Sequence, residues 1–243
     1  MVDISENGGS SRYNGLQVNA QRRFASGLQF GIAYTLSRSR DDGSSLTDVL
    51  PNAYSAKGYY GLSDFDRTHV LVLNYIYELP LFKAGNGVLH RALGGWELSG
   101  INQFQSGVPL SVRTSADIAG VGTGSGSQFW NLVGDPSTSV GAFTSSAVYF
   151  NTAAFAIPAA GTYGTQLRNS LRGPGFWTWD MGLRKNIATF EKQSLQFRFE
   201  VFDILNHPNW NNPVTDPTNG SFGKVTGKSN DDRQMQLALK YIF

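Results

Sequence analysis

The clearest feature of the chain is an alternation of apolar and polar residues with a period of two, which is the period of a β-strand. It is sharpest between residues 233 and 243, where one face is apolar at every second position. A helix of this sequence would spread both sets of side chains around its surface, so a strand is predicted. The apolar set is Met235, Leu237, Leu239, Tyr241 and Phe243.

Six earlier segments repeat the alternation, so seven long strands are predicted in all. Segments of roughly 10 to 13 residues match the span of a tilted transmembrane strand. Residue Ile101 breaks the rule in the fourth segment, and residues 109–114 could begin an eighth strand. The six segments lie at about residues 16–24, 28–37, 71–79, 96–105, 177–187 and 195–201.

The composition of the polar faces decides the fold class. These faces carry Gln, Asn, Gly, Ala and Ser with isolated Arg and Glu, as the lumen of a water-filled barrel does. The polar face of a β-sandwich meets bulk water and tends to carry more Lys, Glu and Thr. The prediction is therefore an all-β, antiparallel transmembrane β-barrel segment of seven to eight strands. The alternative is a soluble β-sandwich that binds carbohydrate or serves in adhesion.

The connections between the segments alternate between short and long. Residues 24–27 and 190–193 form tight turns and residues 80–94 a somewhat longer one, whereas 40–66, 106–176 and 206–232 are long loops. Barrels in the outer membrane have short periplasmic turns and long extracellular loops. The stretch 115–127, rich in Gly and Ser, is expected to be mobile and extracellular. Aromatic residues gather at segment ends, as an interfacial girdle requires.

The composition of the 243 residues narrows the choice further. Charged residues make up only 16% of the chain, against about 25% in an average soluble domain. No run of about 18 apolar residues exists, which argues against membrane-spanning helices. The net charge of +2 and the scattered basic residues predict no nucleic-acid binding. Without cysteine, the chain has neither a disulfide framework nor a cysteine metal site.

No constellation of residues predicts an enzyme, a cofactor or a metal site. The glycine-rich stretch 120–126 lacks the helix and lysine of a phosphate-binding loop. The carboxylate pairs Asp64/Asp66 and Asp231/Asp232 lack the pattern of a calcium-binding loop, and just before strands they are expected to end loops. The three histidines His69, His90 and His207 are far apart in the sequence, and no catalytic residue is predicted.

Two loop aromatics, Trp130 and Trp210, are the candidates for contact with a ligand. Trp210 lies in the turn-rich stretch 206–213, and a sugar could stack on an exposed indole ring there. The structural alternative is that this stretch only begins a loop.

The number of strands bears on how the barrel closes. With seven alternating strands the first and last run in the same direction, so pairing them would create parallel neighbours. Bacterial barrels of one chain have even numbers of antiparallel strands. The N-terminus also lacks the basic and apolar regions of a signal peptide. Residues 1–243 are therefore expected to be the C-terminal portion of a longer barrel whose plug and earlier strands are absent.

Several motifs, in order along nearly the whole chain, resemble Oar-like TonB-dependent receptors, which are frequent in acidobacteria. The most specific is the stretch 197–207 followed by residues 233–243, with one departure at Asp203, where the family usually has Asn. The other motifs include Tyr13-Asn14-Gly15-Leu16-Gln17-Val18, Ser63-Asp64-Phe65-Asp66-Arg67-Thr68-His69, Gly95-Trp96-Glu97-Leu98-Ser99-Gly100-Ile101 and Leu171-Arg172-Gly173-Pro174-Gly175.

The resemblance implies a location in the outer membrane of a Gram-negative bacterium, in contact with its lipid. It implies import of a large substrate, such as a carbohydrate, peptide or siderophore, and contact with TonB only through the missing N-terminal region. It also implies that the last strand, with Phe243, Tyr241 and Leu239, is a signal for the barrel-assembly machinery.

Overall fold

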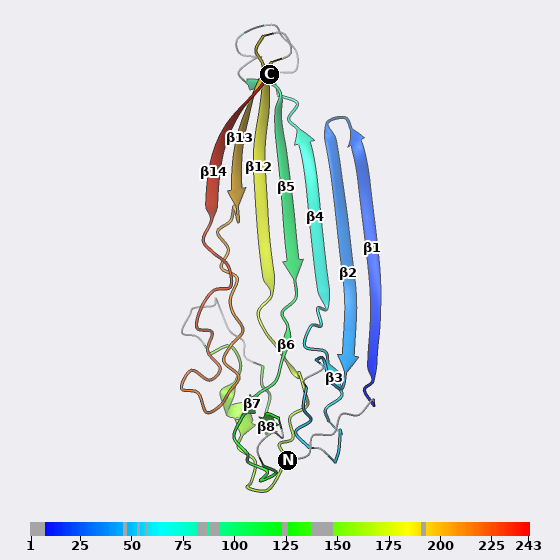
Figure 1. The fold of residues 1–243 in the computed structure, drawn as a ribbon, viewed down its shortest axis with the longest axis vertical. Coiled ribbons are helices and arrows are strands. Elements are labelled where there is room, and N and C mark those ends of the chain that lie inside the picture. The colour runs from blue at the N-terminus through cyan, green and yellow to red at the C-terminus, as the bar shows by residue number, and fades with distance from the viewer. Residues whose placement is uncertain are drawn as a thin grey trace.

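Seven long strands form a single antiparallel sheet in the computed structural model (Figure 1). The structure describes residues 8–45, 48–52, 54–56, 58–81, 87, 93–122, 126–137, 148–190 and 193–243. The sheet order follows the chain, and all seven predicted strands are confirmed. They are β1 (Ser11–Ala25), β2 (Leu28–Asp41), β4 (His69–Glu78), β5 (Trp96–Gln105), β12 (Phe176–Ala188), β13 (Ser194–Phe202) and β14 (Gln234–Ile242).

Residues 109–114 do not form an eighth long strand, so that prediction is wrong. They divide into β6 (Pro109–Leu110) and β7 (Arg113–Thr114), which pair with β11 (Leu171–Arg172) and β8 (Gln128–Phe129) outside the main sheet. Between β6 and β7, Ser111 and Val112 are buried among the loops. The remaining elements are β3 (Gly61–Leu62), which pairs with β2, the pair β9 (Asn131–Leu132) and β10 (Phe155–Ala156), and the 3-10 turn η1 (Thr152–Ala154).

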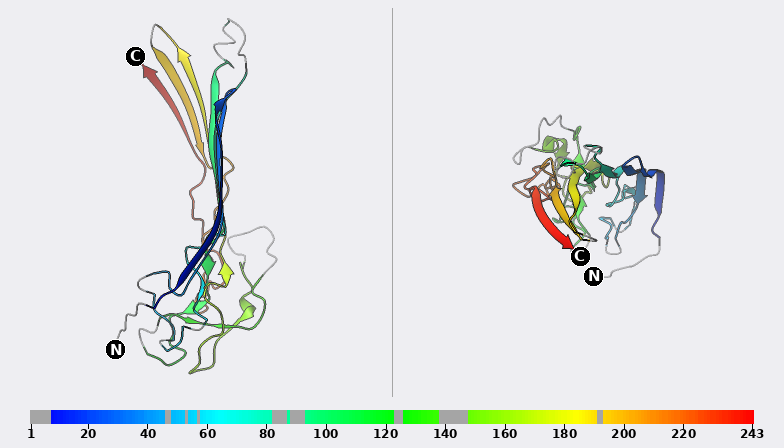
Figure 2. Two further views of the ribbon diagram at one scale, coloured as in Figure 1. Left: turned by 90° about the vertical axis from the view of Figure 1, so that its right-hand side faces the viewer. Right: turned by 90° about the horizontal axis from the view of Figure 1, so that it is seen from above.

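The long strands make one curved layer, so the alternative of a β-sandwich is wrong (Figure 2). In a sandwich two sheets bury their apolar faces against each other. Here the apolar side chains of the sheet remain uncovered by protein, and Leu237 is 68% exposed. No helix in the described ranges is long and apolar enough to cross a membrane.

The strand register places the alternating side chains on two distinct faces. On the apolar face one hydrogen-bonded row crosses six strands through Leu28, Tyr77, Leu98, Leu183, Phe199 and Leu237. One residue further along, the row on the polar face is Gln29, Ile76, Ser99, Gly182, Glu200 and Gln236. The predicted alternation is thus confirmed, with a few apolar exceptions on the polar face such as Ile76 and Ile101.

Short connections lie at one end of the sheet and long loops at the other, as predicted (Figure 1). The β1–β2 turn places Ser26 and Gly27 at φ 54° and 80°, the left-handed conformation that a two-residue hairpin turn with the right twist requires. Between β12 and β13 the Gln193 N–H donates to the Phe190 carbonyl at 2.8 Å, while residues 191–192 lie outside the described residues. Strands β1 and β14 run in the same direction, from the loop end to the turn end.

The hydrophobic core lies in the long loops rather than against the sheet. We call the described parts of residues 42–68, 106–175 and 203–233 the loop cap. Three phenylalanine rings, Phe150, Phe155 and Phe222, meet edge to face with centroids 5.4–6.4 Å apart. Val112, Ala154 and Leu171 are buried in the same cluster, and Phe222 packs against it. The loops therefore form a packed body at one end of the sheet.

Part of the stretch 115–127 is held by hydrogen bonds. The Asp117 carboxylate accepts the backbone N–H groups of Val121 and Gly122 at 3.0 and 2.7 Å, and the amide of Gln128 at 2.9 Å. The hydrogen bonds from Gly122 and Val121 lower the pKa of Asp117 below its usual value. Residues 123–125 lie outside the described residues, and the mobility of this loop stays a prediction.

The two faces should respond differently to a new charge. Because the apolar face is expected to meet lipid, Leu237→Arg or Phe199→Arg should cost about 2–4 kcal/mol near the bilayer midplane. Gln236→Arg should be mild, since Gln236 already contacts the Glu200 carboxylate on the polar face. The measurement is the fraction of protein that acquires heat-modifiable electrophoretic mobility in cells expressing the natural gene. Equal yields for the three variants would contradict the assignment of the faces.

Candidate functional site: the polar face and its loop cap

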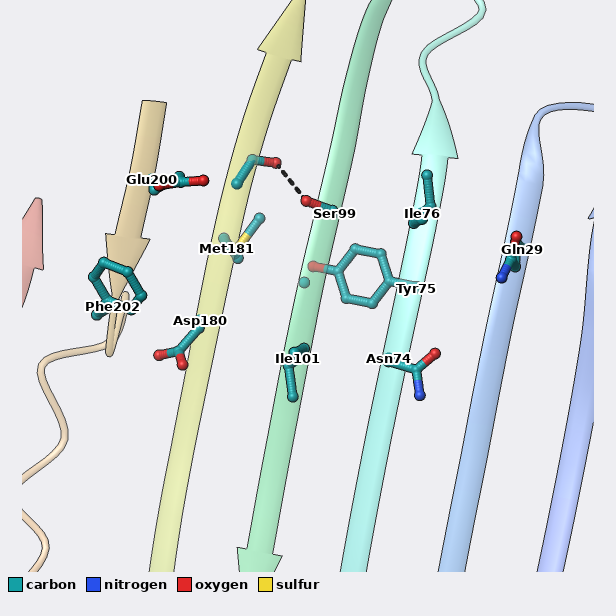
Figure 3. A pocket seen from close by; sticks show the side chains of 12 residues that line it. Gln29, Asn74, Tyr75, Ile76, Ser99, Ile101, Asp180, Met181, Glu200 and Phe202 are labelled. Atoms are coloured by element: carbon teal, nitrogen blue, oxygen red, sulfur yellow. Dashed lines mark hydrogen bonds between the residues drawn. The ribbon is translucent and has the colours of Figure 1, made fainter. Parts of the chain in front are cut away.

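The polar face contains a shallow depression of about 390 Å³ near the middle of the sheet (Figure 3). Its lining comes from five neighbouring strands, β2, β4, β5, β12 and β13, because each contributes every second side chain to this face. Hydrogen-bonding groups alternate there with apolar side chains. The hydrogen-bonding members include Gln29, Asn74, Ser99, Asp180 and Glu200, and the apolar members include Ile76, Ile101 and Phe202.

The two carboxylates of the depression already have hydrogen-bond partners. Asp180 accepts the backbone N–H of Asp203 at 2.9 Å, and Glu200 accepts the side-chain amide of Gln236. Asp203 has φ 52°, a left-handed conformation that Asn and Asp tolerate better than most residues. This explains why Asp can stand where the resembling receptors usually have Asn.

Cross-strand hydrogen bonds continue along the polar face toward the turn end. Arg184 pairs with Glu97 at 2.7 Å, which offsets the charge of Glu78 directly opposite Glu97. The Gln196 amide donates to Asn186 at 2.8 Å. The polar face therefore presents hydroxyl, amide and charged groups from the centre of the sheet to its turn end, with apolar side chains such as Ile76 between them.

Carboxylates are confined to this side of the sheet. The seven long strands contain five acidic residues, and the register places every one on the polar face. A carboxylate on a face that meets hydrocarbon would be strongly disfavoured. The five are Asp41, Glu78, Glu97, Asp180 and Glu200.

Close packing on the apolar face compensates for a glycine in β5. The Tyr75 ring crosses from β4 to β5 and covers Gly100, so a Cβ there would lie 2.5 Å from the Tyr75 hydroxyl oxygen. The Trp179 indole N–H donates to the same hydroxyl at 3.3 Å. The aromatic rings of β4 and β12 are thus joined across the glycine of β5 at the centre of the wall.

A buried arginine, Arg168, ties the loop cap to the end of β2. Its guanidinium donates to the Asp41 carboxylate at 2.5 Å, to Asp64 at 3.1 Å and to the Ser44 hydroxyl at 2.7 Å, and its side chain is 4% exposed. It also lies over the Tyr59 ring, 5.2 Å from the centroid. Burial alone would lower the pKa of Arg168, but the hydrogen bond to Asp41 and the nearby carboxylates raise it.

A second arginine, Arg172, makes a parallel contact four residues later. It donates to the Asp66 carboxylate at 2.6 Å, and Asp66 also accepts the backbone N–H of Ser39 at 2.6 Å. Between the two arginines, the Asn169 amide donates to the Leu62 carbonyl at 2.6 Å. Residues 168–172 therefore hold the loop cap against the rim of the sheet. The sequence pattern does not reveal these contacts, because the partners of residues 168–172 lie about a hundred residues away in the sequence.

Three of the four acidic residues considered in the sequence form ion pairs. Asp64 and Asp66 bind the two arginines, and Asp232 pairs with Lys228. His69 is hydrogen-bonded to the Tyr34 hydroxyl at 2.8 Å, and His207 lies against the Trp177 ring. His90 lies outside the described residues. No group of three potential ligands for a metal ion occurs within the described ranges.

The two candidate ligand-contacting tryptophans are both partly buried in the loop cap. The Trp130 ring lies 6.3 Å from that of Phe222 beside the hydrophobic core, and its indole N–H has no hydrogen-bond partner in the described part of the chain. Trp210 forms an isolated β-bridge with Lys228. Contact of either ring with a ligand stays a prediction.

The residues of the predicted assembly signal lie at the turn end of the sheet edge. Leu239 and Tyr241 project from β14 on the apolar face, and Phe243 follows with 93% of its surface exposed. The rings of Tyr241 and Phe243 lie 6.1 Å apart. The three side chains thus form a continuous exposed apolar strip.

Comparison with known proteins gives one match. The family model described as "Outer membrane beta barrel domain" matches residues 1–236. No curated protein and no solved structure matches the chain.

The Arg168 contacts should be essential to the position of the loop cap. Replacing Arg168 with Met leaves the buried Asp41 carboxylate unpaired, which should cost about 3–5 kcal/mol. We expect faster protease cleavage within residues 106–175 and a lower unfolding temperature. Arg113→Met, which removes an exposed arginine from the same loop, is the matched control. Cleavage at the same rate in both variants would show that Arg168 does not anchor the cap.

Proposed function

Because the chain belongs to the family of outer membrane beta barrel domains and lies in the outer membrane of a Gram-negative bacterium, we propose that it forms part of the wall of a TonB-dependent transporter. In this proposal the apolar face meets lipid, the polar face lines the lumen and the loop cap lies outside the cell. The imported substrate is large, and a carbohydrate, a peptide or a siderophore would suit the hydrogen-bonding groups of the lumen.

The observation that carries the proposal is the common direction of β1 and β14. Two strands that run the same way cannot pair antiparallel, and an unpaired edge in lipid costs several kcal/mol for each unsatisfied backbone group. In this proposal an odd number of further strands lies between them and closes the barrel. A wide barrel with an internal plug, reached by TonB through its N-terminal region, fits this arrangement and agrees with the motifs along the chain.

The depression on the polar face is the part of the wall best suited to contact a passing substrate. Its amide, hydroxyl and carboxylate groups can exchange hydrogen bonds with a hydroxyl-rich or amide-rich molecule. The exposed apolar surface of Phe202 beside them would favour stacking with a sugar ring or an aromatic group. Each of these contacts is weak, so a transported molecule could bind to the wall and leave it again.

The exposed edge of β14 supports a role for this strand in assembly. An incoming barrel strand can pair through its backbone with an open edge of the barrel-assembly machinery, while alternate side chains give specificity. Leu239, Tyr241 and Phe243 would supply those side chains.

Uptake measurements test the proposed transport. Cells lacking the gene, cells lacking TonB function and wild-type cells should be compared over a panel of oligosaccharides, peptides and iron chelates at limiting concentration. We expect the gene deletion and the TonB defect to abolish uptake of the same compound. Uptake that needs the gene but persists without TonB would identify a passive pore instead.

The kinetics of assembly test the role of the C-terminus. Appending a few polar residues after Phe243 in the natural gene should slow the acquisition of heat-modifiable mobility in a pulse-chase experiment, while folded barrels stay stable. The same residues inserted in the loop at position 121 serve as the control. Normal assembly rates for the extended protein would show that Phe243 is only an interfacial anchor.

A further inference from the structure

The β1–β2 hairpin carries three arginines beside the loop end of the apolar face. Arg12 lies directly opposite Arg40, and Arg38 lies opposite Asn14. Because alternate residues point to opposite sides of a sheet, Arg38 and Arg40 continue the side of Leu36. Their exposure agrees with this, since both are exposed while Ser39 and Asp41 are buried on the polar side.

These three arginines of the hairpin have no acidic partner in the described part of the chain. Arg168, Arg172 and Arg184 each form an ion pair, whereas Arg12, Arg38 and Arg40 form none in the described part of the chain. The carboxylates of the long strands lie on the opposite side of the sheet. The nearby Asp42 is engaged with the backbone N–H of Ser10 at 2.9 Å. Among the described residues, no carboxylate pairs with the three guanidinium groups.

A fourth arginine, Arg67, lies near the end of β2. The Arg67 carbonyl accepts the Ser37 hydroxyl at 2.9 Å, which holds Arg67 beside the end of β2. Its guanidinium donates to the Asp66 carbonyl at 3.2 Å and makes no ion pair in the described residues. Arg67 also interacts electrostatically with the Asp66 carboxylate and with Arg172.

The depth of the cluster places it at the level of lipid headgroups. In β2 the apolar side runs from Leu28 to Leu36, which corresponds to about 27 Å along the strand. A tilted strand of this length matches the apolar band of about 25 Å in outer-membrane barrels. Arg38 and Arg40 follow two and four residues later, about 7 and 14 Å further along the strand. They lie just beyond the hydrocarbon, where a bilayer carries its polar groups.

We infer that Arg12, Arg38 and Arg40 bind the phosphate groups of a phosphorylated glycolipid of the outer leaflet, namely lipopolysaccharide. This rests on the proposed placement of the long loops outside the cell. The planar guanidinium group donates two parallel hydrogen bonds to a phosphate and is the preferred side chain for that task.

The surface below the cluster favours a lipid over free phosphate. Leu16, Val18 and Leu36 lie on the same side of the hairpin and are exposed. Acyl chains attached to the bound headgroup would cover them, and burial of apolar surface contributes roughly 25 cal/mol per Å². An inorganic phosphate ion has no apolar part that could cover this surface.

The test uses full-length protein purified from outer membranes in mild detergent and titrated by native mass spectrometry. The probes are lipid A with both phosphates, enzymatically dephosphorylated lipid A and inorganic phosphate. We expect wild-type protein to prefer the phosphorylated lipid, and Arg38→Gln/Arg40→Gln to weaken this binding by about tenfold or more. The matched control, Arg113→Gln/Lys240→Gln, also removes two charges and should bind like the wild type.

Several outcomes would overturn the inference. These are equal affinity of wild-type protein for lipid A with and without phosphates, unchanged binding by Arg38→Gln/Arg40→Gln, or competition by inorganic phosphate at the same concentration as the lipid. If the double glutamine variant does not assemble, Arg38→Lys/Arg40→Lys keeps the charge but loses the paired hydrogen bonds, and reduced binding is again expected. Since the readout needs no transport, a failure here is distinct from TonB-independent uptake.

Discussion

A strand inside hydrocarbon has no water to satisfy its backbone N–H and C=O groups, so each strand must pair with a neighbour along both edges. This requirement explains the single antiparallel sheet in chain order, whose long strands pair without interruption in the described residues except for one register shift in β1 between Arg22 and Ala25. Once the backbone is paired, each side chain points either to the lipid or to the lumen. The distribution of charge then follows, because strand carboxylates can stay hydrated only on the side of the lumen.

The strands were predictable from sequence because alternation is a local property. Leu237 and Gln236 are neighbours in the chain, and their difference in polarity alone assigns them to opposite faces. The loop cap was not predictable, since its contacts join residues such as Asp41 and Arg168 that are 127 positions apart. Residues 109–114 were mistaken for the start of a long strand because Leu110 and Val112 alternate with polar neighbours. Their partners in fact come from distant loop segments, which no local pattern reveals.

The sheet and the loop cap are stabilised in different ways. The apolar face gains its burial from lipid, whereas the cap has a protein core of aromatic rings around Phe150. The link between them is polar and depends on the short segment that carries Arg168 and Arg172 just before β12. Because the Arg168–Asp41 pair is buried and the Arg172–Asp66 pair is partly buried, salt screens them less than surface pairs. These contacts hold the loop cap in place at the rim of the sheet, although its loops are long.

The common direction of β1 and β14 also limits how such a wall can change in evolution. Adding or losing one strand would reverse the direction of every strand that follows and would exchange loops and turns between the two sides of the membrane. Adding or losing a pair leaves all other directions unchanged. The hairpin is therefore the smallest segment by which this wall can be duplicated or deleted, and related barrels should differ in circumference by whole hairpins.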